Sequence, residues 1–123
     1  MSMSYLQERK QAFKYAFKGL QLLQKEAHFK IQFFVAIAIS IIGYFAQLNP
    51  TQWALQFSAI FFVFICEGIN TSIEALSDAI TTEQNFKIKI AKDIAAGVVL
   101  LASFYAILIA GFIYLPKFVI QFF

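Results

Sequence analysis

Uncharged, apolar residues fill three long stretches of the chain. Residues 31–48 carry no charged side chain over 18 positions, and residues 94–115 carry none over 22. Residues 53–66 are also uncharged, and their helical pattern continues to about residue 80. A helix needs roughly 20 predominantly apolar residues to cross a bilayer. The pattern therefore predicts three membrane-spanning helices, at about residues 30–48, 53–70 and 94–115.

Residues 5–25 have a different, amphipathic pattern. Leu6, Phe13, Phe17 and Leu20 recur at helical spacing, with charged residues mostly between them. This pattern predicts a surface helix with its apolar face on the bilayer and its lysines toward lipid headgroups. Packing of the same face against other helices of the protein is an equally good interpretation.

Polar segments separate the predicted helices. Residues 49–52 contain a proline and predict a tight turn, because the residue before a proline is biased away from the helical conformation. Residues 81–85 predict a loop, and the basic stretch 86–93 is expected to open the third spanning helix. Pro116 and Lys117 are expected to mark the end of that helix.

The composition agrees with a protein that lies in lipid. Of 123 residues, 60% are hydrophobic and 14% are charged, against about 25% charged residues in soluble domains. A soluble domain of this size leaves roughly a third of its chain surface exposed and could not hide so much apolar surface. We expect one all-α integral membrane domain over residues 1–123.

The basic residues indicate how the chain crosses the membrane. Six of the ten precede the first span, three lie between the second and third, and the first turn has none. The positive-inside rule therefore places the N-terminus and residues 70–93 in the cytoplasm and the C-terminus outside. The net charge is only +3, and the basic residues do not form a nucleic-acid footprint, so no nucleic acid partner is expected.

Four polar residues follow the second apolar stretch at steps of three, four and four: Glu67, Asn70, Glu74 and Asp78. At 100° per residue these side chains share one helix face. A charge at membrane depth costs about 2.5–3.5 kcal/mol on insertion scales. Glu67 directly follows 14 uncharged residues, so it is the most informative member of the stripe.

This acidic stripe has three possible uses. Its carboxylates can hold a divalent cation, since Mg²⁺ typically takes one or two carboxylates plus substrate phosphates. One carboxylate can act as a general base. Alternatively, the acids form plain structural ion pairs with Lys89 and Lys92. Spacing alone leaves all three open.

Familiar nucleotide and nucleophile motifs are missing from the sequence. It contains no P-loop, no GxGxxG and no kinase catalytic loop, and its five glycines are scattered. With one histidine and one cysteine, no Ser–His–Asp or Cys–His set is expected. We interpret His28 as a lipid-headgroup contact, and Cys66 as a buried thiol without a disulfide partner.

Longer motifs carry a resemblance to one family. They are FKYAFKGL at 13–20, Glu26 followed by Phe29, EGINTSIEALSD at 67–78 and AKDIAAG at 91–97. In order, separation and three-span layout the chain resembles the prokaryotic diacylglycerol kinases over nearly its whole length, and it looks most like their undecaprenol kinase branch. It departs from the family at Gly68, where a bulky apolar residue is frequent, and at 84–85.

The resemblance implies an activity and an assembly. A homotrimer in the bacterial inner membrane would transfer the γ-phosphoryl of ATP to the hydroxyl of undecaprenol or diacylglycerol, with active sites at subunit interfaces. Mg²⁺ would accompany the nucleotide. No pattern in this sequence separates a polyprenol from an acylglycerol, and the branch likeness favours undecaprenol.

Site residues follow from the resemblance by position. Glu67 would be the general base, Asn70 would orient it, and Lys92 would neutralise phosphate charge beside Asp93, which would order the site. Glu26 and Glu74 would hold the metal ion. The nucleotide would lie among eight residues: Tyr15, Lys18, Glu26, Glu74, Asp78, Glu83, Lys92 and Asp93.

Two other functions fit the residue pattern. An intramembrane glutamate suits a small proton-coupled transporter, although three spans and acids gathered at one side speak against it. A non-enzymatic membrane subunit could use the acidic stripe to bind a basic partner.

Overall fold

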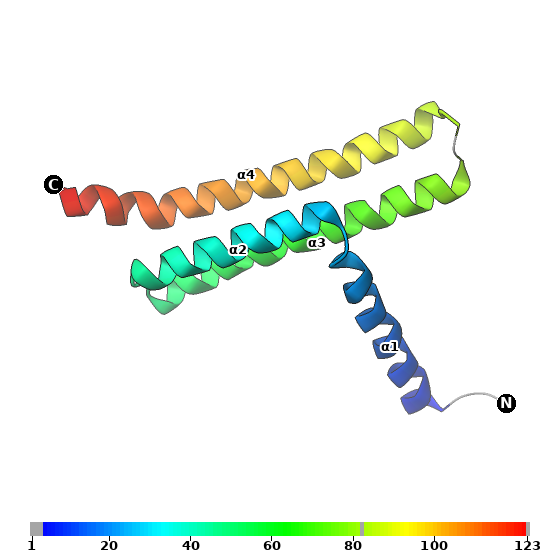
Figure 1. Ribbon diagram of the computed structural model, residues 1–123, viewed down its shortest axis with the longest axis horizontal. Helices are drawn as coiled ribbons and strands as arrows, with labels where there is room; N and C mark the ends of the chain where they lie inside the picture. Colours follow the sequence, from blue (N-terminus) through cyan, green and yellow to red (C-terminus); the bar gives the residue numbers. More distant parts are fainter. Residues whose placement is uncertain (1–3, 82, 123) are drawn as a thin grey trace.

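The computed structural model describes residues 4–81 and 83–122, and these form four helices without a strand. They are α1 (Tyr5–Leu23), α2 (Ala27–Phe45), α3 (Pro50–Ile80) and α4 (Phe86–Phe122). Helices α3 and α4 run beside each other over most of their length, α2 packs on α3, and α1 projects away from this bundle (Figure 1).

Helices α2, α3 and α4 are each long and apolar enough to cross a membrane. Their lengths are 19, 31 and 37 residues. Most large apolar side chains on them are exposed, among them Phe34, Phe61 and Phe112, as expected where lipid rather than water surrounds the protein. The predicted all-α fold with three spanning segments is confirmed in these respects.

The turn between α2 and α3 lies earlier than predicted. Residues 49–52 do not form a turn, because Pro50 is the first residue of α3. Proline suits this position, where its missing N–H has no helical partner in any case. Asn49 caps the helix through a reciprocal pair of hydrogen bonds with Gln52, of 2.8 and 3.0 Å. The chain reverses over residues 46–49 instead, with Gln47 in a left-handed conformation at φ 56°.

The predicted end of the last helix was wrong as well. Helix α4 continues through Pro116 to Phe122. Prolines are tolerated in spanning helices, where neighbouring groups satisfy the backbone atoms that a proline leaves free. Lys117 donates to the Gln47 carbonyl at 3.4 Å, so this turn of α4 is tied to the loop between α2 and α3.

A buried polar network joins the three spanning helices at the end near this loop. Tyr114 of α4 donates to the side-chain oxygen of Gln56 in α3 and lies 3.3 Å from the Ile39 carbonyl in α2. Gln56 also donates to the Ile39 carbonyl, at 3.4 Å. Both side chains are buried. Gly43 lies one turn after Ile39 and packs closely against Tyr114 of this network.

Gly43→Ala is therefore expected to lower the free energy of unfolding by about 1–3 kcal/mol, the usual effect of overpacking. An added Cβ would lie 3.0 Å from Leu48 and Trp53 and 3.1 Å from the Tyr114 hydroxyl. Thermal unfolding in detergent measures the effect. Gly97→Ala is the matched control, because nothing lies within 4 Å of its added Cβ and alanine favours a helix by about 1 kcal/mol over glycine. Equal melting temperatures for the two variants would contradict the close packing at Gly43.

Helix α1 begins at a capping box, in which Ser4 and Gln7 exchange hydrogen bonds of 3.2 and 3.3 Å. Its residues are exposed up to Leu22, the apolar ones included, and only Leu23 is half-buried. Leu23 lies against Gly68 of α3, where an added Cβ would come within 3.3 Å of it. The helix is thus anchored to the bundle at its C-terminal end.

Candidate active site

Glu67 is buried on α3, and so is Asn70 about one turn further along the helix. Their residues are 5% and 8% exposed. Within the described residues, Glu67 Oε2 and Asn70 Oδ1 are buried and lack a hydrogen-bond partner. Both atoms are acceptors, so each lacks a donor. Burying an unpaired carboxylate is unfavourable, and such a group marks a functional site in a spanning segment.

The rest of the acidic stripe lies toward the end of α3 and is more exposed. The side-chain amide of Asn70 donates a hydrogen bond to Glu74 at 3.3 Å. The orienting role implied for Asn70 would instead require a hydrogen bond to Glu67. Asp78 accepts a hydrogen bond from Lys92 of α4 at 3.2 Å. The stripe therefore runs from a buried end at Glu67 to an exposed end that faces α4.

Lys92 and Asp93 open the membrane-spanning part of α4 opposite the stripe. The Lys92 side chain is 39% exposed and that of Asp78 is 70% exposed. Asp93 pairs with Lys89 at 2.7 Å on the helix surface. Exposed pairs of this kind are worth about 0–1 kcal/mol, so neither pair is a major contribution to stability. Both leave their charges available to a ligand.

Asn85 fixes the start of α4 and hence the position of Lys92. Its side-chain oxygen accepts from the backbone N–H groups of Lys87 and Ile88 at 3.0 and 3.2 Å. Asparagine is among the preferred helix caps. The departure from the family at 84–85 therefore has a local structural role. Glu83 is exposed in the loop before it and donates its backbone N–H to Thr81 at 3.0 Å.

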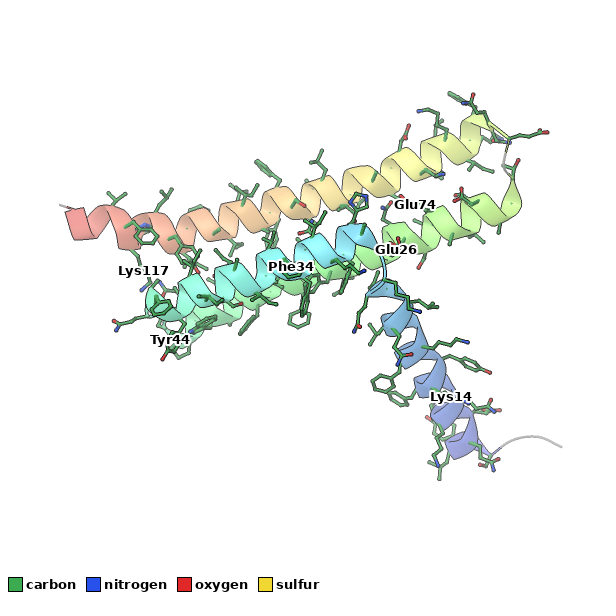
Figure 2. The ribbon with its side chains drawn as sticks, viewed as in Figure 1. Lys14, Glu26, Phe34, Tyr44, Glu74 and Lys117 are labelled. Atoms are coloured by element: carbon green, nitrogen blue, oxygen red, sulfur yellow. The ribbon has the colours of Figure 1, made fainter. Side chains whose placement is uncertain are left out.

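The short link between α1 and α2 carries Glu26 to the same part of the bundle. Glu26 is the N-cap of α2 and its side chain makes no capping hydrogen bond. Leu23 before it lies against Gly68, and His28 after it lies in the first turn of α2, near Glu67. Figure 2 shows Glu26 and Glu74 on this region of the molecule. His28 was interpreted from sequence as a headgroup contact, and only the fold places it near Glu67.

Tyr15 and Lys18 are not brought to this cluster within one chain. Both are exposed on α1, and they precede Glu26 by 11 and 8 residues, which corresponds to about 12–16 Å along a helix. Figure 2 shows Lys14, the neighbour of Tyr15, on a part of α1 well away from Glu26 and Glu74. These two residues therefore do not meet the stripe of their own chain.

The carboxylates of this region suit the binding of a metal ion together with a nucleotide better than the binding of a metal ion by protein ligands alone. Over residues 4–81 and 83–122, no three His, Cys, Asp or Glu side chains gather closely enough to hold a metal ion. Mg²⁺ does not need such a cage, because one or two carboxylates and the phosphates of a substrate suffice. The exposed carboxylates of Glu26 and Glu74 fit that requirement.

Taken together, these groups provide the parts that phosphoryl transfer requires. A buried carboxylate without a donor can take a proton, a half-buried lysine can neutralise phosphate charge, and exposed carboxylates can hold a cation. The buried acid lies 11 residues before Asp78, or about 16 Å along α3. One helix thus reaches from an apolar environment to a solvated one.

Comparison with known sequences identifies a family and two relatives. The chain matches the family described as prokaryotic diacylglycerol kinase over residues 14–114. It is 33% identical to an undecaprenol kinase of Bacillus subtilis over 107 residues, 86% of this chain and 87% of that protein. It is 32% identical to a diacylglycerol kinase of Synechocystis sp. over 108 residues, 85% of this chain and 61% of that protein. The family match includes every candidate site residue.

Proposed function

Because the chain belongs to the prokaryotic diacylglycerol kinase family, we propose that it phosphorylates undecaprenol at the cytoplasmic face of the bacterial cell membrane. Membership of this family indicates a multi-pass membrane lipid kinase, that is, a phosphotransferase with an alcohol as acceptor and ATP as co-substrate. The likeness of its motifs to the undecaprenol kinase branch favours undecaprenol over diacylglycerol. Overall identity to the two relatives is nearly equal, at 33% and 32%.

Glu67 is the proposed general base. The lipid hydroxyl donates its proton toward the free Oε2 of Glu67 while its oxygen forms a bond to the γ-phosphorus of ATP. The bond from that phosphorus to the β–γ bridging oxygen breaks, and ADP leaves. The observation that supports this role most directly is the buried carboxylate oxygen that lacks a donor. A base must lie within hydrogen-bond reach of the proton that it takes.

The charged groups around Glu67 position the nucleotide. Lys92 neutralises negative charge on the phosphates, and Asp93 and Asp78 hold the lysines of α4 in place through the pairs described above. Asn70 links the buried base to Glu74. Glu26 and Glu74 would hold Mg²⁺, which when bound neutralises and orients the phosphates of ATP.

The proposed enzyme is a homotrimer whose sites lie between subunits. Tyr15, Lys18 and Glu83 complete the nucleotide site in this proposal. The separation of Tyr15 and Lys18 from the stripe of their own chain supports α1 reaching the stripe of another copy. The apolar face of α1 rests on the inner leaflet, with the N-terminus in the cytoplasm and the C-terminus outside, as the distribution of basic residues favours.

A phosphoryl-transfer assay tests the proposal. Purified protein in mixed micelles is given γ-³²P-labelled ATP, Mg²⁺ and equal amounts of undecaprenol and diacylglycerol. We expect labelled undecaprenyl phosphate as the main product and no product when Mg²⁺ is removed by chelation. Labelled phosphatidate as the main product would overturn the choice of acceptor, and no transfer to either lipid would overturn the proposed activity.

A further inference from the structure

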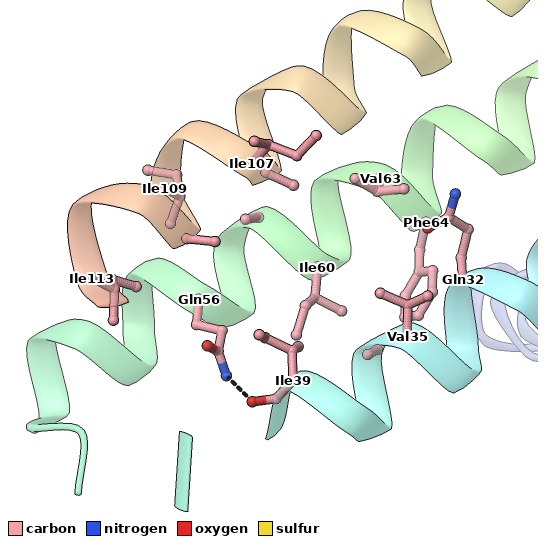
Figure 3. A pocket seen from close by; sticks show the side chains of 14 residues that line it. Gln32, Val35, Ile39, Gln56, Ile60, Val63, Phe64, Ile107, Ile109 and Ile113 are labelled. Carbon is pink, nitrogen blue, oxygen red and sulfur yellow. Dashed lines mark hydrogen bonds between the residues drawn. The ribbon is translucent and has the colours of Figure 1, made fainter. Parts of the chain in front are cut away.

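Helices α2, α3 and α4 surround an apolar cavity of about 200 Å³ within their membrane-spanning parts (Figure 3). Fourteen residues line it, and only Gln32 and Gln56 among them are polar. Ala36 and Ala59 are two of four lining alanines, and they leave the space that larger side chains would fill. The amide of Gln56 is engaged with Ile39. An apolar cavity of this kind does not attract water.

The two ends of the cavity lie at different parts of the structure. Val63 and Phe64 line one end, about one helical turn before Glu67. Phe64 packs there on Phe29 with ring centroids 4.9 Å apart. Gln56 lines the other end, within the polar network that joins the three helices. The cavity thus begins next to the proposed acceptor site and extends about 10 Å along α3 toward the opposite end of the bundle.

We propose that this cavity holds the part of the lipid acceptor's hydrocarbon chain nearest its hydroxyl, while that hydroxyl lies at Glu67. The inference rests on the proposed kinase function and names where the acceptor is recognised. The position of the cavity favours the acceptor over a helix of a second copy as occupant. Its apolar lining begins about one helical turn from Glu67, where the alcohol of the acceptor would react. About 10 Å of hydrocarbon chain next to the hydroxyl matches the length and the apolar lining of the cavity, and the rest of a polyprenol would extend into the bilayer.

Filling the cavity tests this assignment. Ala36→Leu adds three carbons to a lining residue, and Ala38→Leu adds the same atoms to an exposed residue of α2 outside the cavity. We expect Ala36→Leu to raise the KM for undecaprenol about tenfold or more, the effect of a few methylenes in an apolar pocket. Its KM for ATP and its turnover of a five-carbon prenol should stay within about twofold of wild type. Ala38→Leu should resemble wild type with both alcohols.

A second variant and a labelling experiment support the first test if Ala36→Leu folds poorly. Ala59→Leu fills the cavity from α3, with exposed Ala54→Leu as its control. A polyprenol that carries a diazirine in its chain should label residues 56–64 in the wild-type protein on irradiation. Labelling confined to the exposed faces of the helices would overturn the proposal.

The outcomes separate this inference from the proposed function. If wild type phosphorylates neither prenol, the proposed function fails and the inference fails with it. If wild type phosphorylates both and Ala36→Leu has the same KM values as Ala38→Leu, only the inference fails. A change of oligomeric state in Ala36→Leu and Ala59→Leu, without a chain-length effect, would show that another copy covers the cavity and would also overturn it.

Discussion

Glu67→Gln is expected to lower the rate of lipid phosphorylation by about 10²–10⁴-fold, the usual contribution of a positioned general base, while thermal stability stays the same or rises. Glutamine has the same shape but cannot accept the hydroxyl proton. It also removes a buried charge whose Oε2 lacks a partner within the described chain. A residue kept for function at the expense of stability has this combined signature.

The Glu67 prediction is checked by initial rates in mixed micelles and by thermal unfolding of the same preparations. Glu8→Gln is the control, since Glu8 is exposed in the first turn of α1 and lies outside the proposed site. Full activity in Glu67→Gln would rule out its role as the base. A fall in both activity and melting temperature would instead indicate a structural role.

Lys92→Gln is expected to reduce the turnover number about 100-fold, the typical loss when one group that stabilises transition-state charge is removed. The ion pair of Lys92 with Asp78 offers a competing explanation, in which the lysine only joins α4 to α3. Comparison with Asp78→Asn separates the two. If the pair were only structural, both variants would lose the same activity and the same stability.

We expect the two variants to lose unequal amounts of activity. Lys92→Gln should lose far more activity than Asp78→Asn, because Asp78→Asn frees Lys92 from its partner but leaves its charge beside the phosphates. Exposed Lys87→Gln controls for the loss of one positive charge in the same stretch of α4. Turnover numbers and KM for ATP at saturating lipid provide the measurement, and equal losses in the first two variants would contradict the proposed role.

Much of the fold could be predicted because lipid imposes a simple requirement on sequence. Spanning segments must be helical and apolar, so uncharged stretches showed where α2, α3 and α4 lie. Their ends were less predictable. A proline after a polar residue fits a turn and also the first position of a helix, and only the capping bonds of Asn49 distinguish the two. The end of α4 was predicted too early, at Pro116, because a spanning helix tolerates a proline.

The site could be predicted in composition but not in its contacts. Helical spacing placed Glu67, Asn70 and Glu74 on one face, and the structure keeps them there. The partner of each side chain depends on how helices pack. Asp78 and Lys92 lie 14 residues apart and meet across a loop, and Gln56 and Tyr114 meet over 58 residues. The spacing left a pair between the stripe and Lys92 open without naming Asp78 as the partner, and no local pattern indicates the pair of Gln56 with Tyr114 or the approach of His28 to Glu67.

The length of α3 determines where a water-soluble and an oil-soluble reactant can meet. Its 31 residues measure about 46 Å, whereas the hydrocarbon layer is about 30 Å thick. The remaining 16 Å or so of helix α3 extends beyond the hydrocarbon layer. In the proposed enzyme, one continuous helix would therefore hold a polyphosphate bound near its solvated end and an alcohol at Glu67 at a fixed separation and orientation. Inserting or deleting a single residue between the two would rotate one of them by about 100° away from the other.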